Sequence, residues 1–214
     1  MEKYLIVDTE TANSLEQPLM YDFGYAVIDT NGKVYDSGSY VIAEVFFDKE
    51  LMSSAYYNEK IPHYIKDINE GKSKLIQLHK LHSLVYGIIK KYSITKVIAH
   101  NARFDYASTV TTQRYITCSK YRYFFPYGTK IIDTLKMARN AFKGDEQYRA
   151  FCVDNGYLTK RNQSRYTAEI LYRYIKQDNT FIEEHTALAD VLIEKEIFVE
   201  CLRRNPDFEG YLWE

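Results

Sequence analysis

The sequence is short of glycine and proline, with nine glycines and four prolines in 214 residues. This is roughly half of their usual combined share, which argues against a disordered or fibrous chain. No stretch approaches the roughly 18 consecutive apolar residues of a membrane-spanning helix. A chain of this length buries about 70% of the surface that its unfolded form exposes, so it needs no disulfide or structural metal. We expect one domain over residues 1–214.

Cysteine is also scarce, and the three cysteines form no recognisable site. Cys118, Cys152 and Cys201 lie far apart, so none belongs to a C-x-x-C pair that would bind zinc. Their odd number favours free thiols in a reducing compartment. The apolar run at residues 4–7 is interrupted by Asp8 and is too short for a signal peptide. We therefore expect a soluble cytoplasmic protein with no membrane partner.

Neither sign of charge dominates, because the chain has 28 lysines and arginines and 29 aspartates and glutamates. A uniformly basic polyanion-binding protein is therefore excluded, and a nucleic-acid partner would need a local basic patch. Tyrosine is abundant, with 21 residues. It can serve in cores, on wet surfaces or as a platform on which bases stack, and its frequency alone does not choose among these roles.

The hydrophobic pattern predicts an α/β fold. Short runs with β-branched residues predict five strands, at 3–8, 22–30, 33–42, 95–99 and 130–133. The Asn31-Gly32 pair predicts a hairpin, so the first three strands should be antiparallel. Residues 44–92 should be mostly helical, with Leu75, Leu78, His82, Val85 and Ile89 on one stripe, and further helices are expected near 134–142, 145–155, 167–177 and from 188 onwards. Strands followed by alternating strands and helices predict a mixed sheet covered by helices.

A first pair of carboxylates, Asp8 and Glu10, lies where the first predicted strand ends. Residues two apart on a strand point to the same face. Two like charges so close raise each other's pKa unless a cation lies between them, which makes a metal site the natural resolution. The alternative is a solvated acidic pair at a strand edge.

A second cluster runs from His100 and Asn101 to Phe104 and Asp105, again directly after a strand. The ends of strands in α/β sheets are where ligands and chemistry are usually placed. The alternative is that Asn101 or Asp105 only caps the following helix.

A third cluster contains His185 and Asp190. On one continuous helix five residues turn the chain by about 500°, so these two side chains would point about 140° apart. They can share a site only if His185 precedes the helix and Asp190 lies in its first turn. A loop histidine in a polar stretch suits a general base, so we prefer His185 over His100, which has the same spacing to Asp105.

Together the three clusters resemble the DEDDh (DnaQ-like) group of 3′–5′ exonucleases, in the RNase H-like superfamily. Proofreading exonucleases, RNase T and oligoribonuclease belong to this group. The resemblance rests on D-T-E-T at residues 8–11, H-N-x-x-F-D at 100–105 and H-x-A-x-x-D at 185–190, and it spans nearly the whole chain. It implies a five-stranded mixed sheet of order 3-2-1-4-5, flanked by helices, which agrees with the strand pattern.

The resemblance also implies roles for individual residues. Asp8, Glu10, Asp105 and Asp190 would hold two divalent cations, Mg²⁺ or Mn²⁺, and His185 would act as general base. The physical chemistry agrees, because a set of oxygen ligands without cysteine favours hard cations. Contacts to the terminal nucleotide would come from Thr9, Glu10, Thr11, Asn101 and Phe104. The implied reaction releases nucleoside 5′-monophosphates from the 3′ end of single-stranded or frayed DNA or RNA.

Two further segments are candidates for gripping nucleic acid. Residues 119–127 alternate cations with aromatics, and residues 160–165 form a basic loop. Alternatively, residues 119–127 form a hydrophobic loop that covers the edge of the sheet, and residues 160–165 form a solvated connection between helices. Three functions compete with a free-standing exonuclease. The chain could be a proofreading subunit bound to a DNA polymerase, with Trp213 as an anchor. It could also be an exoribonuclease of the oligoribonuclease or RNase T type, or an inactive binding module. The sequence does not predict the oligomeric state.

Overall fold

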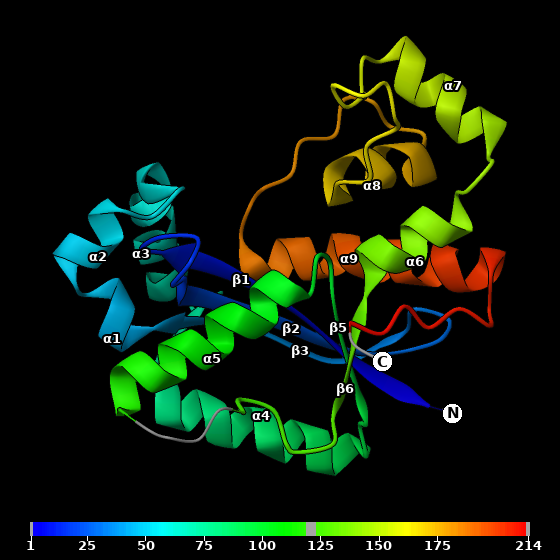
Figure 1. Cartoon of the computed structure of the whole chain (residues 1–214). Coiled ribbons are helices and arrows are strands. Elements are labelled where there is room, and N and C mark those ends of the chain that lie inside the picture. Colours follow the sequence, from blue (N-terminus) through cyan, green and yellow to red (C-terminus); the bar gives the residue numbers. More distant parts are fainter. Residues whose placement is uncertain (1, 119–122, 213–214) are drawn as a thin grey trace.

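The computed structural model describes residues 2–118 and 123–212, which form one mixed sheet of six strands between two layers of helices (Figure 1). The strands are β1 (Lys3–Ala12), β2 (Leu19–Asp29), β3 (Val34–Ile42), β4 (Lys74–Ile76), β5 (Lys96–Ala99) and β6 (Lys130–Asp133). Their order is β4-β3-β2-β1-β5-β6, with β1, β2 and β3 antiparallel and the other neighbours parallel. The α/β fold and the relative order of the five predicted strands are confirmed, and the sheet has one edge strand more than predicted.

The additional strand lies in the stretch 44–92, which was expected to be mostly helical. Leu75 pairs with Val41 of β3 and is not part of the helical stripe. The rest of that stripe lies on α4 (Leu78–Tyr92), whose inner face is buried. A single apolar residue at this spacing fits a strand and a helix equally well, and pairing with β3 decides between them.

Helices cover both faces of the sheet. They are α1 (Ala43–Phe46), α2 (Lys49–Ser53), the 3-10 helix η1 (Asn58–Lys60), α3 (Ile61–Asn69), α4, α5 (Arg103–Thr117), α6 (Thr134–Ala141), α7 (Glu146–Asp154), α8 (Ala168–Lys176) and α9 (Ala187–Arg204). Helices α1 to α5 enclose one hydrophobic cluster against the sheet, and α6 to α9 enclose a second cluster on the opposite face. The four helices predicted after residue 133 are each found within a residue or two of the expected bounds.

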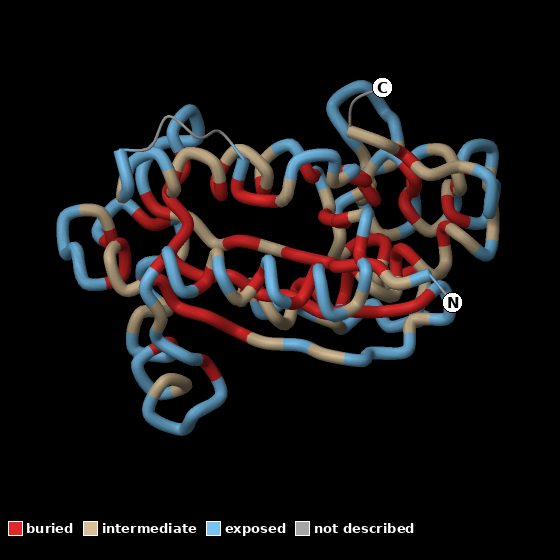
Figure 2. Tube along the Cα trace, turned by 90° about the horizontal axis from the view of Figure 1, so that it is seen from below, coloured by how far each residue is buried: buried red, intermediate tan, exposed pale blue. Residues whose placement is uncertain are grey.

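The two layers give β1 a different neighbour on each face. Leu5 and Val7 belong to the cluster under α4 and α5, whereas Tyr4 and Ile6 belong to the cluster under α9. Figure 2 shows buried residues along the central strands and exposed residues around the periphery. Because side chains alternate along a strand, the next even-numbered residues of β1 also face α9.

No helix within the described ranges is both long enough and apolar enough to cross a membrane. All three cysteines are unpaired; Cys118 is exposed, whereas Cys152 and Cys201 are buried. Burial raises the pKa of the Cys201 thiol to about 12, so this thiol stays protonated at neutral pH.

Candidate active site

The first two carboxylates lie inside β1 and not at its end, which corrects the predicted strand boundary. β2 continues to pair with β1 as far as Ala12, so Asp8 lies opposite Gly24 and Glu10 opposite Asp22. The polar residues obscured this extension, because polar side chains usually mark the end of a buried strand. Both carboxylates still share one face, the face under α9, as the strand period predicts.

Asp105 reaches the same region from the first turn of α5. β5 ends at Ala99, so the edge of β1 beyond it has no strand partner on that side. Asp105 Oδ1 accepts the backbone N–H of Thr9 at 3.0 Å and the Thr9 hydroxyl at 2.9 Å. The same hydroxyl lies 2.8 Å from Ser108 Oγ. Thr9 is buried, and its side chain holds Asp105 in place from the α5 side of the sheet.

The third cluster has the arrangement that its spacing predicted. α9 begins at Ala187, which leaves His185 in the preceding segment and puts Asp190 in the first turn. Two residues of β2 place this helix end. Asp22 Oδ2 accepts the N–H of Ala187 at 2.9 Å, and Gly24 has no side chain to keep the helix away. A Cβ at Gly24 would lie 2.3 Å from the carbonyl carbon of Ala187, so any other residue would displace the helix that carries Asp190.

His185 is held between two residues of the segment around η1. Its ring stacks on the ring of Tyr57, with 4.5 Å between centroids and 14° between planes. Lys60 Nζ donates to the carbonyl oxygens of Glu184 and His185. Burial, reinforced by the Lys60 charge, lowers the pKa of His185, so the imidazole is neutral and able to accept a proton at neutral pH.

The acidic side chains destabilise one another's charges. Burial, followed by repulsion from Asp190, raises the pKa of Glu10 to about 9. Burial, followed by repulsion from Glu183, raises the pKa of Asp190 to about 8. The pKa of Asp8 is raised well above its usual range by burial and by the Asp105 carboxylate. The site therefore brings the four predicted carboxylates within electrostatic reach of one another.

The donor set fits a divalent cation. Among the described residues, ligand atoms of Glu10, His185 and Asp190 lie within 4.8 Å of one another. Asp190 Oδ1 is buried and has no hydrogen-bond partner in the described chain. Carboxylate oxygens suit Mg²⁺ and Mn²⁺, whereas an imidazole is more often a ligand of zinc and other transition metals. His185 thus lies beside two of the predicted metal ligands, Glu10 and Asp190.

The sequence pattern did not single out several charged residues of this site. Glu194 lies on α9, nearly fully buried; its Oε1 accepts the N–H of His100 at 3.0 Å, and burial raises its pKa. Glu183, Asp22 and Lys60 also act on the pKa of Asp190. The four-residue spacing from Asp190 to Glu194, one helical turn, is a signal that could have found Glu194.

Both ring nitrogens of His100 have hydrogen-bond partners within the protein. Its Nε2 lies 2.9 Å from the carbonyl oxygen of Tyr166, and its Nδ1 lies 2.9 Å from Thr134 Oγ1. A carbonyl can only accept, so Nε2 carries a hydrogen and donates it to Tyr166. Burial lowers the pKa of His100. With both ring nitrogens engaged, His100 joins β5, α6 and the segment before α8.

The other predicted contacts are spread around the acidic residues. Thr11 is partly buried in β1, past the position where the register between β1 and β2 shifts. Asn101 is exposed at a positive φ of 60°, and its N–H donates to Asp133 Oδ1 at 2.9 Å. Phe104 is partly buried at the start of α5. These three residues remain predictions as substrate contacts.

The two candidate gripping segments differ in position. Of residues 119–127, positions 119–122 lie outside the described residues, as does Trp213. Phe124 and Phe125 are buried in the core, and Tyr127 lines a separate pocket away from the carboxylates. The loop 160–165, in contrast, contributes four residues to a cleft that Asp8 and Asp190 also line: Asn162, Gln163, Ser164 and Arg165.

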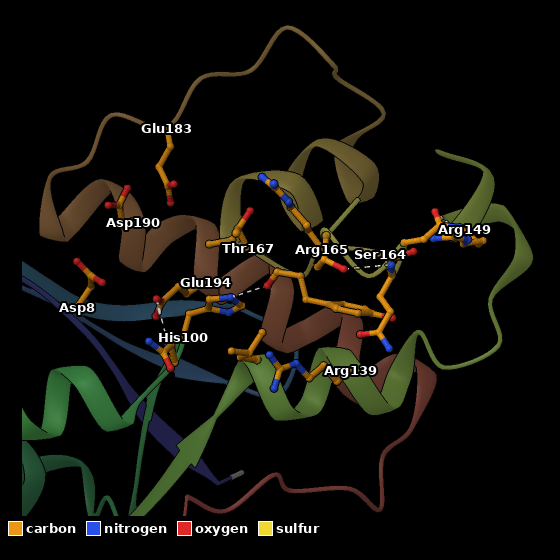
Figure 3. Close-up of a pocket in the computed structure, with 17 residues that line it drawn as sticks. Asp8, His100, Arg139, Arg149, Ser164, Arg165, Thr167, Glu183, Asp190 and Glu194 are labelled. Atoms are coloured by element: carbon orange, nitrogen blue, oxygen red, sulfur yellow. Dashed lines mark hydrogen bonds between the residues drawn. The ribbon is translucent and has the colours of Figure 1, made fainter. Parts of the chain in front are cut away.

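This cleft has a volume of about 1390 Å³ (Figure 3). Its acidic end is lined by Asp8, Glu183, Asp190 and Glu194. Figure 3 shows Arg139, Arg149 and Arg165 at the other end, beyond His100. The volume exceeds the 300–1,000 Å³ typical of small-molecule pockets, so the cleft has room for a ligand longer than a mononucleotide.

The fold matches that of solved structures of Exonuclease I. A structure of E. coli Exonuclease I in complex with a dA16 oligonucleotide matches 96% of this chain and 42% of that chain, with a TM-score of 0.57 and 15% identity. The zinc-ion-bound form of the E. coli ExoI–ssDNA complex matches 96% and 42%, with a TM-score of 0.59 and 14% identity. A moderately thermophilic Exonuclease I from Methylocaldum szegediense matches 97% and 42%, with a TM-score of 0.62 and 14% identity.

The chain thus spans less than half the length of these proteins. No protein-family profile matches the sequence, and a comparison with curated proteins finds no match. At 14–15% identity the structural likeness establishes the shared fold.

Proposed function

We propose that this chain is a metal-dependent 3′–5′ exonuclease of the DEDDh type. It would hydrolyse phosphodiester bonds at the 3′ end of single-stranded or frayed nucleic acid and release nucleoside 5′-monophosphates. The observation that carries this proposal is the electrostatic coupling of four carboxylates from β1, α5 and α9, with His185 beside Glu10 and Asp190. Two of the four, Asp8 and Asp190, line one end of a cleft. The oligonucleotides in the Exonuclease I structures support nucleic acid as the ligand.

Asp8, Glu10, Asp105 and Asp190 would hold two divalent cations, Mg²⁺ or Mn²⁺. When bound, such ions supply electrostatic stabilisation of the charge that develops on the phosphate. The neutral His185 imidazole accepts the proton of the attacking water. Thr9 fixes the Asp105 carboxylate, and Thr11, Asn101 and Phe104 contact the terminal nucleotide.

Digestion of matched, labelled DNA and RNA oligonucleotides, single- and double-stranded, with Mg²⁺ or Mn²⁺, tests the proposal. Stepwise shortening from the 3′ end, blocked by a 3′-phosphate and indifferent to a 5′ block, is the expected result. Asp8→Asn should abolish it. Cleavage of a circular single strand would contradict an exonuclease, and no hydrolysis of any strand would contradict a nuclease.

The remaining alternatives differ in substrate and partner. Preference for short RNA over DNA would identify an exoribonuclease of the oligoribonuclease or RNase T type. Co-purification with a DNA polymerase would identify a proofreading subunit. The DNA ligands of the structures that share this fold favour DNA as the first substrate to test.

A further inference from the structure

Three arginines converge on the end of the cleft that lies away from the carboxylates. Arg139 comes from the last turn of α6, Arg149 from α7 and Arg165 from the segment before α8. We call these three residues the arginine arm. Figure 3 shows the arm across the cleft from Asp8 and Asp190, with His100 between the two ends. One continuous cleft therefore joins an acidic end to a basic end.

Backbone hydrogen bonds fix the segment that carries Arg165. A short hairpin joins Leu158 to Ser164, closed by the Thr159 N–H, which donates to the carbonyl of Gln163 at 2.8 Å. The backbone of Arg165 follows directly, with its N–H donating to the Tyr157 carbonyl at 3.0 Å.

Two partly buried contacts fix the residues that follow the hairpin. The hydroxyl of Tyr148, which is 1% exposed, donates to the carbonyl of Arg165. The carbonyl of Tyr166 accepts from the partly buried His100 ring. The position of Arg165 is therefore coupled to the wall of the acidic site.

The charges of the arm are not neutralised within the described chain. Arg149 Nη2 donates to Asn162 Oδ1 at 3.2 Å and Arg165 Nε donates to the Leu158 carbonyl at 3.1 Å, and both acceptors are neutral. Among described residues, no carboxylate lies within ion-pair distance of any arm guanidinium. Three arginines elsewhere are paired: Arg173 with Glu169, Arg203 with Glu200, and Arg204 with Glu200 and Asp145. What sets the arm apart is that its three unpaired arginines line one cleft.

Unpaired guanidinium groups oriented by neutral acceptors are suited to phosphate, which they bind with charge-assisted hydrogen bonds. The partly exposed Tyr166 ring also lines this part of the cleft and offers a stacking surface for a base. A chain with a net charge of −1 needs a local basic patch to hold a polyanion, and the arm supplies one.

We propose that the arginine arm binds the backbone phosphates of the strand on the 5′ side of the bond that is cleaved. This inference rests on the proposed function. β1 continues beyond Asp8 through Glu10 and Thr11, on the side away from α6, α7 and α8 (Figure 1). With a 3′-terminal nucleotide held at Glu10 and Thr11, the upstream part of the strand would pass along the cleft towards the arm. The ligand is thus a single-stranded polynucleotide of several residues.

Binding without cleavage tests the arm independently of catalysis. The probe is a fluorescent oligothymidylate of about 12 nucleotides, within the usual site size of single-strand binders, in EDTA over a series of NaCl concentrations. For single strands the slope of log K against log salt changes by about 0.7 for each phosphate contact. Arg139→Ala/Arg149→Ala should therefore reduce the slope by about 1.4 and weaken binding by about tenfold or more per arginine.

Lys90→Ala/Arg114→Ala is the matched control, because it removes the same charge from α4 and α5 on the opposite face of the sheet. The control should bind like the wild type, and melting curves should show that both double variants are folded. If the arm variant keeps the wild-type affinity and salt slope, or if the control loses as much, the arm does not bind the strand.

A minimal substrate separates this proposal from the proposed function. The p-nitrophenyl ester of thymidine 5′-monophosphate has no upstream phosphate, so the arm variant should hydrolyse it at the wild-type rate while its KM for the oligonucleotide rises. If the wild type hydrolyses neither substrate, the exonuclease proposal fails while the binding result on the arm still stands. An equal loss of activity on both substrates would show that the arm acts on the catalytic carboxylate site. That result would overturn its assignment to upstream phosphates.

Discussion

The ring of Tyr57 lies nearly parallel to the ring of His185, with 4.5 Å between their centroids. His185 has a positive φ of 51° and precedes α9, so its own backbone does not belong to a regular element. The stacking contact and the Lys60 bonds to the carbonyls of Glu184 and His185 orient the imidazole towards Glu10 and Asp190. Glu183 Oε2 also lies 3.6 Å from His185 Nδ1. The histidine is therefore positioned by a segment that lies far away in the sequence.

Removal of the Tyr57 ring should lower activity without removing the base. Aromatic stacking contributes about 0.5–1.5 kcal/mol, so Tyr57→Ala should reduce turnover by up to about tenfold. Tyr57→Phe keeps the ring and should retain nearly full turnover. Steady-state kinetics on a single-stranded oligonucleotide provides the measurement, and equal rates for all three proteins would show that stacking does not orient His185.

His185→Ala should lower turnover by about 10² to 10⁴, the usual contribution of general base catalysis. We expect its melting-temperature increase with Mg²⁺ to remain, because Mg²⁺ prefers the oxygen ligands of the site. A lost Mg²⁺ response would instead identify His185 as a ligand, in line with its nearness to Glu10 and Asp190.

His100→Ala provides the contrasting variant. It removes a partly buried ring that bonds the buried Thr134 and the Tyr166 carbonyl. We expect a lower melting temperature, since a buried polar group that loses its partner costs about 1–3 kcal/mol. A folded His100→Ala protein that is inactive, beside a fully active His185→Ala protein, would reverse the assignment of the base.

Divalent cations should stabilise the protein. A ligand at 100 times its Kd adds about 2.7 kcal/mol, and 1 kcal/mol corresponds to about 2–4 °C for a chain of this size. We therefore expect Mg²⁺ or Mn²⁺ to raise the melting temperature by about 5–10 °C. Asp8→Asn should lose most of this rise and melt higher than the wild type in EDTA, because it removes one of the repelling charges. A wild-type melting curve that neither ion changes would argue against a shared metal site.

The metal-free protein should become less stable as pH rises. The folded-state pKa values of Glu10, Asp190 and Asp105 are raised to about 9, 8 and 7, so between their ordinary values and these values the folded state holds protons that the unfolded chain has released. Each such proton costs up to about 1.4 kcal/mol per pH unit. Melting temperatures in EDTA should therefore fall from about pH 6.5 to pH 9, by roughly 3–5 °C per unit for one proton.

Glu10→Gln should flatten this decline, and Mg²⁺ should weaken it in the wild type. The lowered pKa values of His100 and His185 act in the opposite direction, because stability is lost as these histidines become protonated in the unfolded chain below about pH 6.5. Melting temperatures that are constant or rise across the upper range would contradict the mutual repulsion of the carboxylates.

The local pattern of the sequence was enough to predict much of the fold. Period-2 and period-3.6 apolar spacings located five strands and the later helices, because these periods follow from backbone geometry alone. The spacing of His185 and Asp190 predicted that the histidine precedes α9, which the structure confirms. The edge strand β4 was missed, because three residues, of which two adjacent ones are apolar, have no distinguishing period.

The order of residues along the chain specifies which carboxylates and histidines are available, and on which strands and helices they lie. The neighbours of these side chains come from the packing of elements that are distant in sequence. Gly24 lets α9 approach β2, and Tyr57 and Lys60 hold the His185 segment from a distant part of the chain. The arginine arm also depends on three separate elements that meet around one cleft. Such contacts are not encoded in any local period, because they arise only when the packing of the two helical layers brings distant residues together.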